Sequence, residues 1–452
     1  MVLTVTEALK HINADLAHLL DAPAIVAVCR EVGYQWRARL LDPVTTVHLF
    51  LLPILHRNTA CSHLPHLARQ RFTASAFCQA RTRLPLGVLQ QLVRRTSVPL
   101  EQMTQDEGRW RGHRTFLVDG SSFSMPDTPE LQEHFGQPSG QRPGCGFPVA
   151  HVLALFHAGT GCLLEVLVAP WHTHDMAQVA SLHPTLQPGD VLVGDRAFCS
   201  FAHLAFLRHQ SLHALFRVHQ KQMVDFTPSR SHTASTPQAA QKGRPRSRWL
   251  RQLGVTDQLV EWVKPVRPPV HPPAWMTPAL FASLPEVLCV RELRYRVAQA
   301  GFRTRMVTLV TTLLEADQYP AAALAELYRL RWQVETNLRH LKQTMGLDVL
   351  HCQRLTGVMK ELTVFALVYN LVRVVMLEAA KRQGVALERI SFIDALRWLS
   401  TARPGEPLPP LVVNPHRPDR VEPRAVKRRP KPYPLLTKPR REARNILIRQ
   451  SV

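Results

Sequence analysis

The chain has 452 residues, more than one compact domain usually holds, so we expect two to four modules. Its 56 Lys and Arg against 34 Asp and Glu give a formal net charge of +22, and a surplus of this size favours a polyanionic partner such as nucleic acid. The eight cysteines form no C-x-x-C pair, which argues against a zinc ribbon or a disulfide framework.

The hydrophobic pattern argues against membrane and secreted proteins. The longest apolar run, residues 362–377, is interrupted by Asn370 and Arg373, so we expect a buried helix and no membrane span. The first twenty residues contain acids and no continuous apolar segment, unlike a secretory signal. We therefore expect a cytoplasmic protein.

Residues 1–105 carry helical periodicity interrupted by prolines and predict a small helical domain. Within it, TASAFCQARTRLP predicts a helix that is capped by Thr73, presents Gln79, Arg81 and Arg83, and stops before Pro85. Such a helix could enter a DNA groove, and an ordinary amphipathic helix with exposed arginines fits the pattern equally well.

From about residue 113 the pattern changes to that of strands. HRTFLVDGSSF predicts a strand ending at Asp119, VAHVLALFHAGTGCLLEVLVAP predicts a hairpin, and QPGDVLVGDRAF predicts a short strand ending at Gly194 and Asp195. A helix beginning near Asp175 separates the last two features, and HALFRVHQ supplies a further strand.

Residues 219 to about 275 are rich in Ser, Thr, Pro and basic residues and predict a mobile or DNA-ordered loop. EVLCVRELRYRV and FRTRMVTLVTTLL then read as strands, and residues 361–381 and 390–400 as helices. The segment from Arg417 to Val452 has twelve Lys or Arg and three acids, with prolines that prevent a long helix before Arg440, and we expect it to contact a polyanion.

The stretch YRLRWQVETNLRHLK predicts a helix that carries a phenol, a guanidinium, a carboxylate and an ammonium. At 100° per residue, Tyr328, Arg331, Glu335 and Lys342 project within about 60° of one another. The simplest interpretation is a solvated charged face beside an apolar stripe.

Three acids stand out together: Asp119 and Asp195 after strands, and Glu335 in a late helix. Phosphodiester chemistry with two Mg²⁺ ions needs hard oxygen ligands that converge from separate elements. Any one of these acids is weak evidence, because turns favour Asp, but their order along the chain is more specific.

VDGSSF, GDRAF and above all Tyr328-x2-Arg331-x3-Glu335-x6-Lys342 resemble the acidic motifs of the DDE transposases of bacterial insertion sequences, in particular the insertion-sequence-4 family with its Y-R-E-K signature. The resemblance spans roughly residues 70 to 440. It implies an α/β fold: an RNase H-like catalytic core interrupted by a largely β insertion, with an N-terminal helical domain and a basic C-terminal tail.

The resemblance implies five regions: a helical domain for DNA binding, the first part of the core, the basic insertion, the rest of the core, and a Pro-rich tail, at residues 1–105, 110–218, 219–315, 316–402 and 403–452. It implies that Asp119, Asp195 and Glu335 are catalytic metal ligands for Mg²⁺, with Mn²⁺ as an alternative. Tyr328, Arg331 and Lys342 take positions that contact phosphates, and Trp332 takes that of an aromatic residue near the DNA, although core packing explains Trp332 equally well.

The expected activity is cleavage at inverted-repeat ends of double-stranded DNA and transfer of the 3′ ends to target DNA, by a homodimer in the synaptic complex. A DDE-type nuclease that cuts without joining and a domesticated DNA-binding protein without catalysis are the alternatives.

Other candidate sites are weaker. His172, His174 and Asp175 in WHTHD resemble metal ligands, but no third nitrogen or sulfur ligand is in view, and Asp175 more simply caps the next helix. Ser121 and Ser122 lack a G-x-S-x-G elbow, and Cys199 lacks a base partner.

Overall fold

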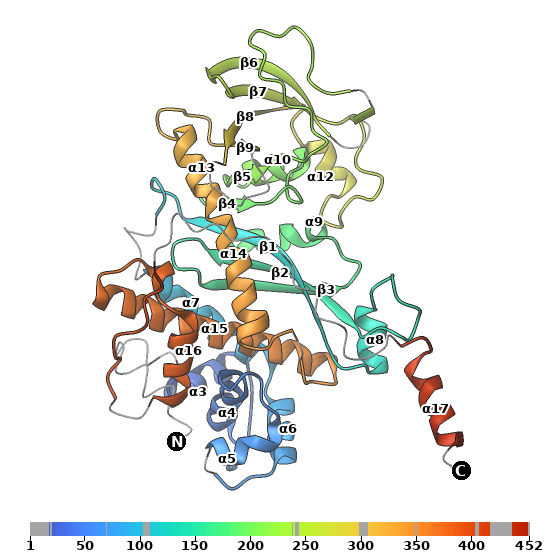
Figure 1. Ribbon diagram of the computed structural model, residues 1–452, viewed down its shortest axis with the longest axis vertical. Helices are drawn as coiled ribbons and strands as arrows, with labels where there is room; N and C mark the ends of the chain where they lie inside the picture. Colours follow the sequence, from blue (N-terminus) through green and yellow to red (C-terminus); the bar gives the residue numbers. More distant parts are fainter. Residues whose placement is uncertain are drawn as a thin grey trace.

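The computed structural model describes residues 18, 20–68, 70–102, 109–236, 238–239, 244–297, 306–348, 350–402, 406–415 and 436–450. Much of the expected basic tail, residues 416–435 in particular, lies outside this set. The described residues form a central sheet with helices on both faces, a helical unit built largely from the N-terminal region, and a C-terminal helix that projects from the body (Figure 1).

The N-terminal region is helical, as its periodicity predicts. Its elements are α3 (Ala22–Glu31), α4 (Pro43–Leu55), η1 (Cys61–His63), α5 (Leu64–Ala68), α6 (Ala74–Arg83) and α7 (Leu86–Gln102). Helix α4 begins with Pro43 after Asp42, whose carboxylate accepts a hydrogen bond from the Thr45 N–H at 2.7 Å. Thr73 caps α6 as predicted, through the Ala76 N–H at 3.1 Å.

One arginine of α6 differs from the sequence prediction. Arg83 is exposed, but the guanidinium of Arg81 turns inward, 3.7 Å from Cys61 Sγ and over the rings of Phe50 and Phe77. The aromatic faces stabilise it there. Arg81 is therefore not presented to a DNA groove.

A single nine-stranded sheet runs through the molecule in the order β3-β2-β1-β4-β5-β9-β8-β7-β6. Its strands are β1 (Thr115–Ser124), β2 (Val149–His157), β3 (Leu163–Pro170), β4 (Val191–Gly194), β5 (His213–Arg217), β6 (Arg246–Gly254), β7 (Asp257–Val263), β8 (Val287–Arg296) and β9 (Met306–Thr311). β1 pairs with β2, and β2 with β3, in antiparallel fashion, whereas β1, β4 and β5 are parallel. The remaining pairs are antiparallel, so this is a mixed sheet in an α/β fold, as expected.

The basic region after residue 219 contains more regular structure than its composition predicts. Strands β6 and β7 form an antiparallel hairpin inside the segment interpreted as a loop. β6 is one of the two edge strands of the sheet, and its Arg248 and Arg251 are exposed. An edge strand with polar residues on both faces lacks the apolar alternation by which strands are recognised.

Short helices connect the strands: α8 (Pro129–Phe135), α9 (Asp175–Gln178), η2 (Val179–Thr185), α10 (Phe201–His209) and α12 (Pro278–Ser283). The C-terminal elements are α13 (Ala321–Arg329), α14 (Arg331–Arg339), the π-helical turn η3 (His340–Thr344), α15 (Leu355–Gln383), η4 (Leu387–Arg389), α16 (Phe392–Thr401) and α17 (Arg440–Gln450). Figure 1 shows α13 and α14 following one another along the sheet.

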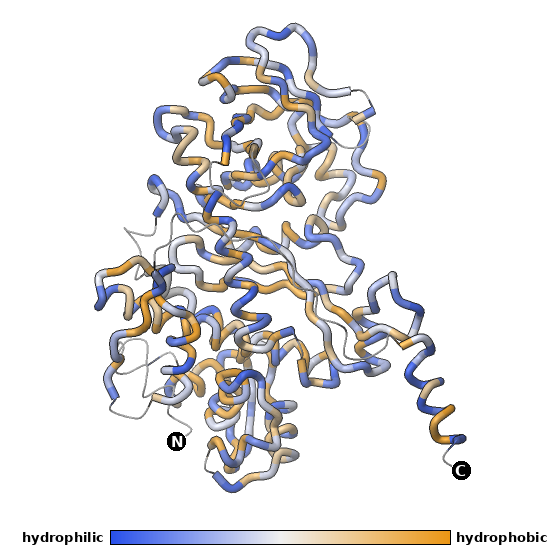
Figure 2. Tube along the Cα trace, viewed as in Figure 1, coloured by the Kyte–Doolittle hydropathy of each residue, from blue (hydrophilic) through white to orange (hydrophobic). Residues whose placement is uncertain are grey.

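Helix α15 is the buried helix that the sequence predicts at residues 361–381. It is long and apolar enough to cross a membrane by length and composition, but 83% of its most apolar window is buried inside the protein. It packs against α7, α4 and α16 and ends at Gly384 with a left-handed φ of 60°. Figure 2 shows hydrophobic residues along the central elements, whereas α17 mixes both kinds.

Candidate active site

Two of the predicted acids lie side by side on the sheet. Leu117 of β1 pairs with Val193 of β4, and Asp119 and Asp195 each follow two residues later. Because side chains two apart in a strand point to the same face, Asp119 shares the face of Leu117. Asp119 was expected at the end of its strand, but it lies in the interior, because β1 continues its pairing with β2 as far as Ser124.

The third acid reaches this face from α14. Arg331, at the start of α14, lies with Nη1 3.5 Å from Asp119 Oδ2 and donates from Nη2 to Glu335 Oε1 at 3.1 Å. A guanidinium that is only 9% exposed therefore joins carboxylates that are 216 positions apart in the sequence. The structure thus joins Asp119 and Glu335 through Arg331, and the charge of Asp195 acts on Asp119.

Burial and charge together set the state of Asp119. Burial raises the pKa of its carboxyl to about 6, although Arg331 and the hydrogen bond from the Gly120 N–H at 2.9 Å act in the opposite direction. The carboxylates of Asp195 and Asp175 raise this pKa further. A cluster of this kind favours any cation that can share its negative charge.

The helix predicted from Tyr328 to Lys342 is interrupted. α13 ends at Arg329, Leu330 forms a tighter turn, and α14 begins at Arg331. Tyr328 is therefore not on a solvated face: it is 4% exposed, and burial raises the pKa of its hydroxyl while Arg331 and Arg217 oppose this. The guanidinium carbon of Arg331 lies 5.9 Å from the Tyr328 ring centre.

Lys342 lies in the π-helical turn η3, and this turn changes the angular spacing assumed for a regular helix. Its Nζ donates to Ser121 Oγ at 3.3 Å. Ser121 is on the same face of β1 as Asp119, two residues later. Lys342 thus reaches the acidic site across the helix–sheet interface, and Ser121 holds it there.

Trp332 is 39% exposed, which does not fit the alternative that it packs in the core. The Arg331 guanidinium carbon lies 4.8 Å from its ring centre. Trp332 therefore covers one side of Arg331 while keeping part of its ring open to solvent.

The opposite face of β1 holds a pair that the sequence analysis missed. Asp175 was interpreted as a helix cap, but no side chain caps α9, and Asp175 Oδ1 instead lies 2.5 Å from His151 Nε2. A Cβ on Gly120 would lie only 2.8 Å from Asp175 Cγ and 2.9 Å from Oδ2. Asp175 thus packs against Gly120, the residue that follows Asp119. The motif WHTHD was the sequence feature that could have pointed to Asp175.

Arg217 is a second residue that sequence reasoning missed. Arg217 is the last residue of β5. Leu215 pairs with Val193, and Arg217 follows Leu215 by two residues, so its side chain lies on the same face of the sheet as Asp119 and Asp195. Its charge acts on Tyr328.

His172 and His174 are exposed and make no metal cluster within the described residues.

The donor set fits a divalent cation in its chemistry. Carboxylate oxygens are the hard ligands that Mg²⁺ and Mn²⁺ prefer, and the raised pKa of Asp119 marks a site that gains from added positive charge. Among the residues that the structure describes, no three His, Cys, Asp or Glu side chains are close enough to hold one ion as placed. Arg331 stands between Asp119 and Glu335 instead.

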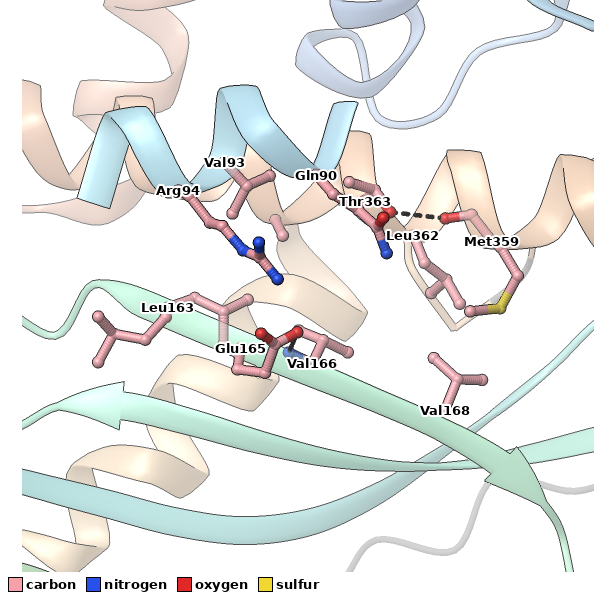
Figure 3. A pocket seen from close by; sticks show the side chains of 12 residues that line it. Gln90, Val93, Arg94, Leu163, Glu165, Val166, Val168, Met359, Leu362 and Thr363 are labelled. Atoms are coloured by element: carbon pink, nitrogen blue, oxygen red, sulfur yellow. Dashed lines mark hydrogen bonds between the residues drawn. The ribbon is translucent and has the colours of Figure 1, made fainter. Parts of the chain in front are cut away.

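One cavity lies apart from the acidic residues. This cavity has a volume of about 60 Å³ and lies between α7, β3 and α15. Figure 3 shows Arg94 and Glu165 on opposite sides of it. It contains none of the acidic residues above and is too small for a nucleic-acid strand. At the acidic site Asp119 and Arg331 are largely buried, whereas the side chain of Glu335 is 51% exposed.

Comparisons with known proteins agree with the motifs. The family described as "Transposase DDE domain" matches residues 110–371. The chain is 30% identical over 129 residues to the putative transposase InsZ of Escherichia coli K12, covering 28% of this chain and 42% of that protein. It is 24% identical over 383 residues to the transposase InsG for insertion sequence element IS4 of the same organism, covering 80% of this chain and 78% of that protein.

A cryo-EM structure of the piggyBac transposase synaptic complex with hairpin DNA is a distant structural neighbour. The TM-score is 0.40 at 10% identity, covering 88% of this chain and 76% of that chain. The family match includes both strand aspartates and the whole Tyr328–Lys342 segment, and it extends over more than half of the sequence. The chain belongs to the DDE transposase family, of the insertion-sequence-4 type.

Proposed function

We propose that this protein is the transposase of a bacterial insertion sequence, which binds inverted-repeat ends, cleaves the DNA and transfers the 3′ ends to target DNA. The observation that carries the proposal is that Arg331 joins Asp119 of β1 to Glu335 of α14, beside Asp195, which directly follows β4 and whose charge acts on Asp119. The high positive charge of the chain suits a double-stranded DNA substrate. Activity as a homodimer in the cytoplasm, at the nucleoid, is part of the proposal.

The strand order supports an RNase H-like core. β3, β2 and β1 are antiparallel, β1, β4 and β5 are parallel, and Asp119 lies in β1 while Asp195 directly follows β4. Residues 110–218 and 316–402 would form this core, and residues 219–315 the insertion that extends the sheet beyond β5. Residues 1–105 and 403–452 would supply further DNA contacts.

Asp119, Asp195 and Glu335 would hold Mg²⁺, with Mn²⁺ as an alternative. A bound divalent cation in such a site lowers the pKa of an attacking water and offsets charge on the leaving oxygen. Arg331 and Lys342 place two positive charges beside these acids, where a DNA phosphate can be bound and oriented. Tyr328 is buried behind Arg331 and would act chiefly by positioning it, whereas Trp332, which is 39% exposed, would contact the DNA.

Single-turnover cleavage of a labelled transposon-end duplex at saturating protein tests the proposal. Asp119→Ala, Asp195→Ala and Glu335→Ala should each abolish cleavage in Mg²⁺ while end binding remains, because losing one carboxylate misplaces the cation. The exposed Asp348 offers a matched control, since Asp348→Ala removes an acid outside the site.

The same assay separates the alternatives. Nicking without joined products would show a nuclease, and retention without any cleavage by the wild-type protein would show a DNA-binding protein that has lost catalysis. Near wild-type cutting by any one of the three variants would remove that residue from the proposed site.

A further inference from the structure

A second cavity, in the N-terminal helical region, combines aromatic rings with arginines. It has a volume of about 560 Å³ and lies between the connection from α3 to α4 and the end of α6. Its walls include Tyr34, Trp36, Arg37, Arg39 and Arg83. None of these residues belongs to the acidic site.

The two aromatic rings form a partly open platform. The ring centres of Tyr34 and Trp36 are 5.8 Å apart with an interplanar angle of 32°, and both rings pack on the hydrophobic core without being fully buried. Partial burial raises the pKa of the Tyr34 hydroxyl, and the nearby charge of Arg83 opposes this shift. Arg83 therefore stands next to the platform.

The arginines around this platform are available to a ligand. Arg37, Arg39 and Arg83 are exposed, and within the part of the chain that is described none of their guanidinium groups makes an ion pair or hydrogen bond. Arg95, in the same helical region, instead pairs with Glu31 at 2.5 Å.

The one acid in the cavity wall, Asp42, has a structural use. Its carboxylate accepts from the Thr45 N–H and caps α4. Three arginines against one carboxylate thus surround two ring faces, and an anion with a flat apolar part could contact both kinds of group.

We propose that this cavity binds an unstacked nucleotide of DNA, with its base against Trp36 and Tyr34 and its phosphates on Arg37, Arg39 and Arg83. Base stacking on aromatic side chains together with a basic surface is the arrangement by which proteins hold single-stranded segments. A continuous duplex keeps its bases stacked and would use only the arginines. The inference rests on the proposed function in taking DNA as the substrate, and it adds a site for an unpaired nucleotide outside the acidic site.

The test compares two labelled DNAs, a blunt duplex and the same duplex with a short single-stranded overhang, by equilibrium binding at several salt concentrations. Trp36→Ala should weaken overhang binding by roughly 5- to 100-fold and leave blunt binding nearly unchanged, because one stacked base is lost. The double variant Arg37→Ala/Arg39→Ala should weaken both and reduce the salt slope by about one to two units.

Three controls keep the result interpretable. Trp36→Phe retains a ring and should restore most of the overhang affinity, and thermal melting shows whether each variant is folded. Arg95→Ala removes an arginine that is paired with Glu31 and should leave the affinity for both DNAs unchanged. Equal loss on both DNAs by folded Trp36→Ala, or tighter binding of an RNA overhang than of the DNA overhang, would overturn the inference.

This test is independent of the cleavage test. If the overhang preference is absent while the wild-type protein cleaves transposon ends, the cavity assignment fails and the proposed function stands. If the carboxylate variants still cleave but Trp36→Ala loses the overhang preference, the proposed active site fails and the nucleotide site stands.

Discussion

Replacing Gly120 by Ala should destabilise the protein through a contact on the far side of the sheet from Glu335. Gly120 has no positive φ, so the position requires glycine for space and not for backbone conformation. A methyl group there would meet Asp175 Cγ at 2.8 Å, so the carboxylate must retreat by about half an ångström or more to reach ordinary van der Waals separation.

Asp175 cannot retreat freely, because its Oδ1 is held by His151 Nε2 at 2.5 Å. Moving the carboxylate lengthens or breaks this hydrogen bond, and a charge-assisted bond between half-buried groups contributes about 1.5 to 3 kcal/mol. The side chains of His151 and Asp175 are 18% and 22% exposed, so solvent screening reduces the contribution of this hydrogen bond. We therefore expect Gly120→Ala to lower the free energy of unfolding by about 1 to 2 kcal/mol.

A double-mutant cycle isolates the cause. Urea unfolding is measured for the wild type, Gly120→Ala, Asp175→Ala and the double variant. Removing the carboxylate makes room for the methyl group, so Gly120→Ala should cost less than about 0.5 kcal/mol in the Asp175→Ala background. If the two single effects add, the contact between Gly120 and Asp175 does not limit this position and the reasoning is refuted.

The Gly120→Ala substitution should also affect catalysis. Asp175 presses on the peptide whose N–H donates to Asp119, so displacement of Asp175 should move Asp119 as well. Single-turnover cleavage by Gly120→Ala should fall by about tenfold or more, since misplacement of a catalytic group by a fraction of an ångström has effects of this size. Binding of the transposon end should be unchanged.

Three further predictions concern other parts of the molecule. Lys342→Ala should leave folding nearly unchanged and slow end cleavage by roughly 10- to 1000-fold, and Lys342→Arg should restore part of the rate if the charge is what matters. If Lys342→Ala cleaves at the wild-type rate in a single-turnover assay, Lys342 has no role beyond that of a solvated surface residue. Deleting Arg417–Val452 should weaken DNA binding and flatten its dependence on salt, measured by titration at several salt concentrations, and an unchanged slope with lost stability would show that the segment serves the fold. Burial lowers the pKa of His203 to about 3 and that of His183 to about 4, as it also lowers the pKa values of His157, His213 and His340, so at these groups the unfolded chain binds more protons than the folded chain below about pH 6.5. The His183–His203 pair should contribute about 2 kcal/mol or more to the loss of unfolding free energy between pH 6.5 and 5, and His183→Leu/His203→Leu should reduce the pH dependence measured by urea unfolding by that amount, while the other histidines keep the remainder.

The elements that the sequence predicts well are those with a strong local pattern. The hairpin of β2 and β3, the short apolar strand before Asp195 and the buried helix around residues 362–377 each carry a clear periodicity and were found where expected. Thr73 likewise identifies the start of α6, because a cap acts within three residues of itself.

The features that the sequence could not predict depend on contacts between distant segments. Asp175 and His151 are 24 positions apart, and only the placement of α9 against the sheet turns a residue at a helix start into a partner for a strand histidine. Asp119 was placed at a strand end because an acid followed by glycine often marks a turn, yet pairing with β2 carries the strand past it.

The segment from Tyr328 to Lys342 shows how tertiary packing modifies a local rule. A regular helix would place its four polar residues on one solvated edge, but the turn at Leu330 and the π-helical turn at His340–Thr344 give each a different environment. Tyr328 is buried, Trp332 is open, and Lys342 reaches Ser121. The spacing of the signature is therefore better understood as the spacing of a three-dimensional site than as one face of a helix.

Arg331 explains how such a site can fold at all. Carboxylates gathered on one face repel one another, and burial of Asp119 alone would disfavour its charged form. Arg331 offsets both effects by pairing with Asp119 and Glu335, and Tyr328 and Trp332 hold its guanidinium from two sides. Its Nε is buried and has no hydrogen-bond partner among the described residues, so the guanidinium is held by its two carboxylate contacts and the two aromatic rings. An arginine in this position compensates the charge of the two acids, which allows them to lie close together in the folded chain.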